Sequence, residues 1–142
     1  MGRSYYFECG RCEYRVAVSG GSDRGVCFGV QTISCLDCKA LYDSVTKLKA
    51  PEAPLLSRWR NLWTLVRQKA SPWHRQSPRV PSFQEALGRL PTLGASTGRW
   101  IQFRLQCPVS AAHRVESWND PGKCPKCGQF MEQSALPFRL WD

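Results

Sequence analysis

The chain has 142 residues, which suits one ordinary domain or two very small ones. Hydrophobic residues make up 42% of it and charged residues 22%, so wholesale disorder is excluded. No apolar run approaches the roughly 20 residues that a membrane-spanning helix needs, and the first residues lack an apolar signal core. We therefore expect a cytoplasmic protein without a membrane span. The formal net charge of the chain is +9.

The eight cysteines have the spacing of metal ligands. They include three C-x-x-C pairs, and two thiolates separated by two residues can chelate one ion from a tight turn. Disulfide frameworks rarely join cysteines that close together, and no secretory signal indicates an oxidising compartment. We therefore expect two Zn²⁺ ions as cofactors. Cys27 is the exception, because it lies in an apolar run where a free cysteine behaves as a small buried hydrophobic residue.

The first predicted site takes four thiolates from two pairs, spaced C-x2-C-x22-C-x2-C: Cys9, Cys12, Cys35 and Cys38. Strand-like segments flank these pairs, at residues 5–7, 14–18, 26–34 and 41–45. Each pair then lies at the tip of a hairpin, and the two tips are expected to face each other across one ion. Four thiolates close a tetrahedral site and leave no position for a substrate.

Residues 5–48 resemble a zinc ribbon, the rubredoxin-like arrangement of two metal knuckles on β-hairpins. Rubredoxin-like iron in the first site, which would make the protein an electron carrier, is the alternative. It is disfavoured because the rest of the chain would have no role.

Residues 51–99 have a different character and carry most of the charge, with eight Lys or Arg against two Asp or Glu. Apolar positions between residues 55 and 66 fall within an arc of about 120° at 100° per residue, which predicts an amphipathic helix. Ser82 and Glu85 have capping-box spacing for a second, short helix that runs through Leu90.

Six basic residues of this connector form the candidate nucleic-acid-binding stripe: Arg58, Arg60, Arg67, Lys69, Arg75 and Arg79. Arginine and lysine would bind phosphates, and exposed aromatic side chains would stack on unpaired bases. Two other interpretations compete with this one. The apolar arc could pack on a ribbon as missing core, or it could bind an anionic membrane surface or the groove of a partner protein. Trp73 and Trp118, in predicted loops, are the tryptophans best placed for contacts.

The C-terminal segment, residues 100–142, repeats the plan and resembles a second, diverged ribbon. Its predicted site takes three cysteines and one histidine, with Asp120 as the fallback ligand: Cys107, His113, Cys124 and Cys127. Residues 100–106 alternate as a strand, and Gly128 is free to adopt the left-handed conformation after the last ligand. The apolar tail, residues 136–142, is expected to add a strand or to pack on the ribbon.

The ligands can also be paired in another way. In a cross-braced RING arrangement, the first and third ligand pairs share one metal. The gap of 68 residues between Cys38 and Cys107 favours sequential pairing, because closing local loops costs less entropy. The predicted fold class is therefore a small, metal-dominated β (α+β) protein. Two zinc-ribbon hairpin modules, residues 1–50 and 100–142, are joined by a helical basic connector, residues 51–99.

An enzyme is not expected, because both predicted sites are saturated with ligands and no catalytic or phosphate-binding motif is present. No small-molecule substrate is expected either. Zinc ribbons in the families that this chain resembles mostly bind nucleic acid or dock into larger assemblies. The leading hypothesis is a non-catalytic zinc protein that binds nucleic acid through the connector. The alternative is an adaptor that docks into a larger protein complex through the ribbon edges and the apolar tail.

Overall fold

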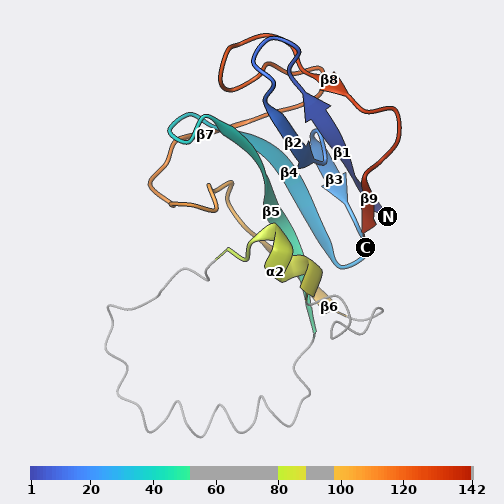
Figure 1. Cartoon of the computed structure of the whole chain (residues 1–142). Coiled ribbons are helices and arrows are strands. Elements are labelled where there is room, and N and C mark those ends of the chain that lie inside the picture. Colours follow the sequence, from blue (N-terminus) through green and yellow to red (C-terminus); the bar gives the residue numbers. More distant parts are fainter. Residues whose placement is uncertain (52–79, 89–97, 142) are drawn as a thin grey trace, which may run out of the picture.

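The computed structural model describes residues 1–51, 80–88 and 98–141, which form a small β-dominated fold (Figure 1). The elements in chain order are β1 (Gly2–Glu8), β2 (Arg15–Val18), β3 (Ser22–Arg24), β4 (Phe28–Cys35), β5 (Ala40–Pro51), α2 (Phe83–Gly88), β6 (Gly98–Gln102), β7 (Val115–Ser117), β8 (Glu132–Gln133) and β9 (Arg139–Trp141). The two N-terminal hairpins, β1–β2 and β4–β5, confirm the strand predictions on both sides of the first two C-x-x-C pairs.

The strands form two sheets, and both contain strands from the two ends of the chain. In the first sheet, β1 pairs with β2, and also with β8 and β9 from the C-terminal segment. In the second sheet the order is β3-β4-β5-β6, and β7 also pairs with β4. The expectation of two ribbons, each built from its own strands, is therefore wrong. Every described strand after residue 97 is paired with a strand that precedes residue 52.

A β-bulge in β5 decides which side chains of the second sheet face the core. Gly29 of β4 lies opposite Lys47 and Val30 lies opposite Val45, so Thr46 has no partner residue. Side chains alternate between the two faces of a strand, and one extra residue reverses the alternation. Val45 and Leu48 can therefore both face the core.

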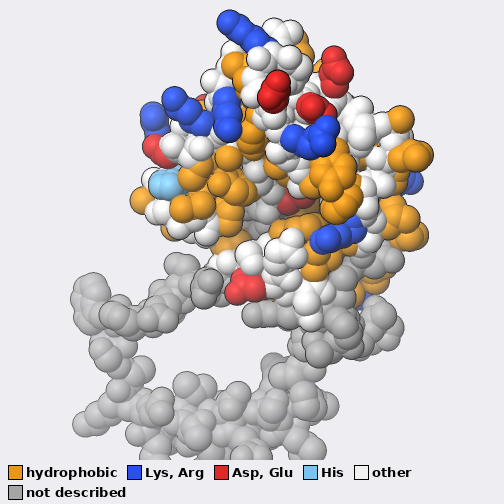
Figure 2. Space-filling view, viewed as in Figure 1, with side chains coloured by type: hydrophobic (Ala, Val, Ile, Leu, Met, Phe, Trp, Pro, Cys, Tyr) orange, Lys and Arg blue, Asp and Glu red, His pale blue; other side chains and the backbone are white. Residues whose placement is uncertain are grey.

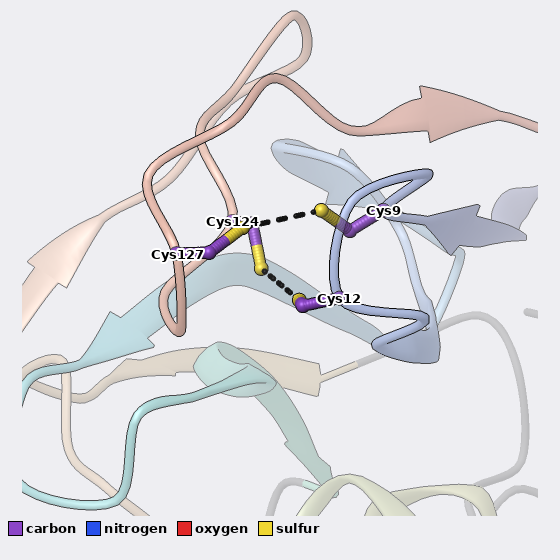
Figure 3. A group of neighbouring side chains, drawn as sticks. All are labelled: Cys9, Cys12, Cys124 and Cys127. Carbon is purple, nitrogen blue, oxygen red and sulfur yellow. Dashed lines mark hydrogen bonds between the residues drawn. The ribbon is translucent and has the colours of Figure 1, made fainter.

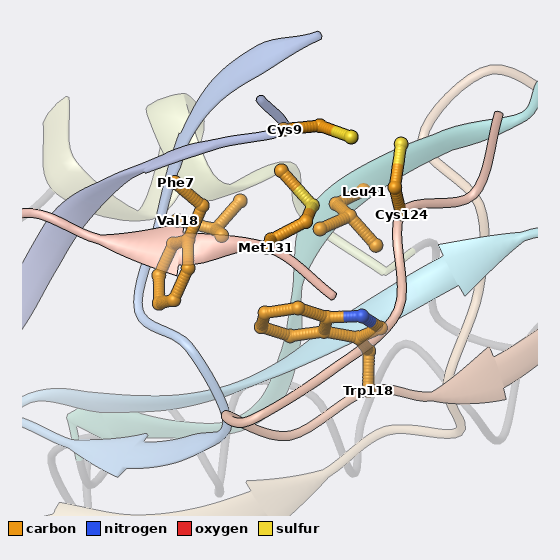
Figure 4. Packing of buried hydrophobic residues seen from close by; sticks show 7 residues of the cluster. All are labelled: Phe7, Cys9, Val18, Leu41, Trp118, Cys124 and Met131. Atoms are coloured by element: carbon orange, nitrogen blue, oxygen red, sulfur yellow. The ribbon is translucent and has the colours of Figure 1, made fainter. Parts of the chain in front are cut away.

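The described residues contain two apolar clusters. The first lies between the sheets, next to one group of cysteines (Figure 4), and its buried members are Phe7, Cys9, Val18, Leu41, Trp118, Cys124 and Met131. The second lies under α2, and its buried members are Cys27, Phe28, Val30, Val45, Leu48, Ala86 and Trp141. The burial of Cys27 agrees with the expectation that it acts as a small hydrophobic residue.

Helix α2 begins as the capping box predicts. The backbone N–H of Glu85 donates to Ser82 Oγ at 3.2 Å, and the backbone N–H of Ser82 donates to the Glu85 carboxylate at 2.7 Å. The predicted amphipathic helix within residues 55–69 lies outside the described residues. So do all six residues of the candidate nucleic-acid-binding stripe.

The tail forms a strand, as expected. β9 pairs with the start of β1, and the Trp141 ring stacks on Phe28 with the ring centroids 4.4 Å apart. Trp118 corrects a prediction, because its side chain is 6% exposed and packs edge-on against Phe7. It is a core residue rather than a contact residue, and its indole N–H donates to the Lys123 carbonyl.

Candidate metal centres

The three C-x-x-C turns share one backbone conformation. The residue that follows the second cysteine has a positive φ in each: 56° at Glu13, 51° at Lys39 and 76° at Gly128. In the first and third turns the N–H of this residue also donates to the carbonyl of the first cysteine, at 2.9 Å in both. The conformation curls the chain around the thiols, and the prediction for Gly128 is confirmed.

The first cluster joins the two ends of the chain (Figure 3). The tip of the β1–β2 hairpin supplies Cys9 and Cys12, and the loop before β8 supplies Cys124 and Cys127. The Sγ atoms of Cys9 and Cys127 are 3.4 Å apart, and those of Cys12 and Cys124 are 3.6 Å apart.

The second cluster joins the tip of the β4–β5 hairpin to the segment between β6 and β7. It consists of Cys35, Cys38, Cys107 and His113. The Nδ1 atom of His113 lies 3.3 Å from Cys38 Sγ and 3.7 Å from Cys35 Sγ, while the Sγ atoms of Cys38 and Cys107 are 3.8 Å apart. His113 is thus the fourth member, and Asp120 is in neither cluster.

The spacing within both clusters suits a tetrahedral ion. Zn–S bonds of about 2.3 Å in a tetrahedron place two sulfurs roughly 3.8 Å apart, and one Zn–N bond of about 2.0 Å places nitrogen and sulfur roughly 3.5 Å apart. The distances between ligand atoms given above are close to these values. A disulfide would need about 2.05 Å, and all eight cysteines are free.

Because the thiols lie close together, the pKa of one cysteine is lowered and that of its neighbour is raised. In the first cluster, the backbone N–H of Cys12 stabilises the Cys9 thiolate and lowers its pKa to about 7. The N–H of Tyr14 favours the Cys12 thiolate too, but burial and the neighbouring sulfurs outweigh it and raise the pKa of Cys12 to about 12. A divalent cation removes this conflict, because it stabilises every thiolate at once.

The second cluster also contains one cysteine with a lowered pKa and one with a raised pKa. Burial raises the pKa of Cys35, but hydrogen bonds from the backbone N–H and the thiol of Cys38 outweigh it and lower the pKa to about 7. Burial and the Cys35 and Cys107 sulfurs raise the pKa of Cys38 to about 11. Tyr42 lies beside this cluster, where burial and its hydrogen bond with Cys38 raise its pKa to about 12.

The predicted pairing of ligands is wrong. Cys9 and Cys12 do not share a cluster with Cys35 and Cys38, and the cross-braced alternative does not occur either. The arrangement is nested: the first ligand pair joins the fourth, and the second joins the third. The pairing of β8 with β1 and of β7 with β4 brings these ligands together. The spacing of the cysteines carries no signal of it.

Among residues 1–51, 80–88 and 98–141, no helix is long and apolar enough to cross a membrane. The chain matches no protein-family model, and neither the curated proteins nor the solved structures compared with it gave a match.

Proposed function

We propose that the chain is a non-catalytic zinc-binding protein that binds nucleic acid through its basic connector. The observation that carries the zinc assignment is the geometry of the two clusters, each with four soft or borderline ligands at tetrahedral spacing. Zinc saturated in this way has no open position for water or substrate, so its role is structural.

Charge supports the nucleic-acid part of the proposal. Residues 51–99 carry eight Lys or Arg and two Asp or Glu. A divalent zinc with four thiolates adds −2, and one with three thiolates and a neutral histidine adds −1, so the rest of the chain comes close to neutral. Two described ends of the connector are paired, because Pro51 of β5 lies opposite Gly98 of β6, and α2 within the connector packs on the second apolar cluster.

The test is fluorescence anisotropy of labelled single- and double-stranded DNA and RNA with zinc-loaded protein at about 50 and 200 mM salt. We expect micromolar binding at low salt that weakens by an order of magnitude or more at high salt. Neutralising Arg58, Arg60, Arg67 and Lys69 should weaken it further. Absence of binding to all four nucleic acids at low salt would reject the proposal.

An adaptor is the second candidate, and the exposed apolar tail favours it. Leu136 is 78% exposed, Phe138 47% and Leu140 55%. Hydrophobic side chains are visible along the flank formed by the C-terminal segment (Figure 2). A larger protein complex could bind there, and such binding would change little between 50 and 200 mM salt.

A further inference from the structure

Where β3, β4, β5 and β6 lie side by side, the second sheet has a basic face that points away from the core. The cross-strand register places Arg24 of β3 opposite Gly29 of β4, Gly29 opposite Lys47 of β5, and Lys47 opposite Gln102 of β6. Directly paired residues point to the same side of a sheet, so these four residues form one row across four strands. The row lies on the side opposite Phe28 and Leu48, which face the core.

The β5 bulge creates this face. Because Thr46 is skipped in the pairing, Leu48 turns inward and Lys47 and Lys49 turn outward. Trp100 of β6 lies opposite Lys49 and therefore also points outward. The register assigns no acidic residue of β3, β4, β5 or β6 to this face, whereas Asp23 and Asp43 lie on the other one.

An aromatic and a guanidinium group are already stacked on this face. The Arg24 guanidinium carbon lies 4.6 Å from the centroid of the Trp100 ring, on top of it. Gly29 lies between them and has no side chain, and the Arg24 side chain passes over it, with Cγ 3.8 Å from the position of a Cβ. Arg24, Lys47 and Gln102 are exposed, and Trp100 is half-buried.

We infer that this face, consisting of Arg24, Lys47, Lys49, Trp100 and Gln102, binds single-stranded nucleic acid. The inference rests on the proposed function and extends it from the connector to the sheet. The cations match the charge of a phosphate backbone, and the Arg24–Trp100 pair offers flat surfaces on which an unpaired base stacks. In a duplex the bases are stacked inside, so a duplex would contact only the cations of this face through its phosphates. The face lies next to the residues where the connector joins the sheet, because β5 ends at Pro51 and β6 begins at its pairing partner Gly98.

The test compares full-length, zinc-loaded variants by anisotropy with labelled 12-nucleotide oligo-dT, oligo-U and a DNA hairpin. The double variant Arg24→Gln/Lys47→Gln should bind both single strands about tenfold more weakly at 100 mM salt. It should also make the negative slope of log affinity against log salt shallower by roughly 1.4, which is 0.7 per lost phosphate contact. The control Lys123→Gln/Arg139→Gln removes the same charge from exposed positions of the C-terminal segment, which lie outside this face. It should change affinity less than threefold.

Trp100→Leu tests stacking without a change of charge. It should weaken single-strand binding at least fivefold and leave hairpin binding nearly unchanged. Equal zinc content and melting temperature in all variants show that the fold is intact. Trp100→Phe, which keeps an aromatic ring, should restore most of the binding.

The outcomes separate the two proposals. If the wild type binds and the connector variant loses affinity, but the sheet variants behave like the control, the sheet is not an interface and the proposed function stands. If the wild type binds no nucleic acid, both fail. A loss confined to the sheet variants, or shared with the connector variant, supports the inference.

Discussion

At the residue scale, the left-handed conformation after the third C-x-x-C pair makes Gly128 sensitive to substitution. Its φ is 76°, and a Cβ at this position would meet no atom within 4 Å, so Gly128→Ala introduces backbone strain without a clash. We expect a loss of about 1 kcal/mol in the free energy of unfolding. Gly10→Ala is the matched control, because Gly10 is also uncrowded and its φ is not positive. Equal losses in urea denaturation would contradict this interpretation.

Asp43 is a second sensitive residue. Its carboxylate accepts hydrogen bonds from the backbone N–H and hydroxyl of Ser19 and from the hydroxyl of Thr32, and burial raises its pKa. Asp43→Ala leaves these donors without their acceptor, which should cost roughly 2–4 kcal/mol. Asp43→Asn keeps one acceptor oxygen and should cost less. Urea denaturation with excess zinc measures the free energy of unfolding of both variants. A larger loss for Asp43→Asn than for Asp43→Ala would contradict this prediction.

The cysteine pKa values give metal binding a defined pH dependence. At pH 8 the Cys12 and Cys38 thiols, with pKa values of about 12 and 11, are protonated without metal and must lose their protons on binding. Below pH 7, Cys9 and Cys35 also take up protons. Zinc affinity should therefore rise with pH. Calorimetry in buffers of different ionisation enthalpy should detect at least one proton released per site at pH 8, and no release would contradict these values.

At the element scale, the bulge in β5 predicts that the fold tolerates the deletion of one residue within a strand. Deleting Thr46 leaves Val45 opposite Val30 and Lys47 opposite Gly29, so every side chain keeps its face. The cost should be about 1–2 kcal/mol, from the hydrogen bonds of Thr46 with Gly29 and Phe103.

Deleting Ser44 is the matched control for this experiment. It reverses the alternation between Asp43 and Val45, which both face the core side, and should prevent folding. Thermal unfolding followed by circular dichroism distinguishes the two deletions. Similar melting curves would mean that the bulge does not set the faces.

Some elements of the fold can be predicted from the sequence and others cannot. The C-x-x-C tips, the first two hairpins, the α2 cap and the apolar tail strand are local patterns, and the structure has them. Trp118 was misassigned because its loop sequence resembles an exposed turn, while its burial depends on Phe7, more than a hundred residues away. The bulge at Thr46 also has no local signal. The connector stripe, which lies outside the described residues, stays a prediction.

At the scale of the whole molecule, the pairing of the ligands is the feature that local reasoning missed. Loop closure becomes costlier only with the logarithm of length. Joining Cys12 to Cys124 rather than to Cys35 costs about 1.4 kcal/mol more by this scaling. Burying a single large apolar side chain offsets that amount. Packing of the C-terminal strands on β1 and β4 therefore overrides the preference for sequential pairing.

Nested pairing makes each ion a link between distant parts of the chain. One ion would join the first hairpin to the loop before β8, and the other would join the second hairpin to the segment before β7. Each site would then close a long loop, and its binding free energy would contribute directly to folding. We expect a strong chelator to abolish the cooperative thermal transition. An unchanged melting temperature without metal would contradict a structural role.

The nested pairing of the ligands predicts different zinc contents for two double variants. Cys9→Ser/Cys127→Ser removes two ligands from one cluster and should retain about one zinc per chain, by elemental analysis after gel filtration. Cys9→Ser/Cys35→Ser removes one ligand from each cluster and should retain almost none. If the second variant keeps one zinc and the first keeps none, the ligands are paired sequentially and this account is wrong.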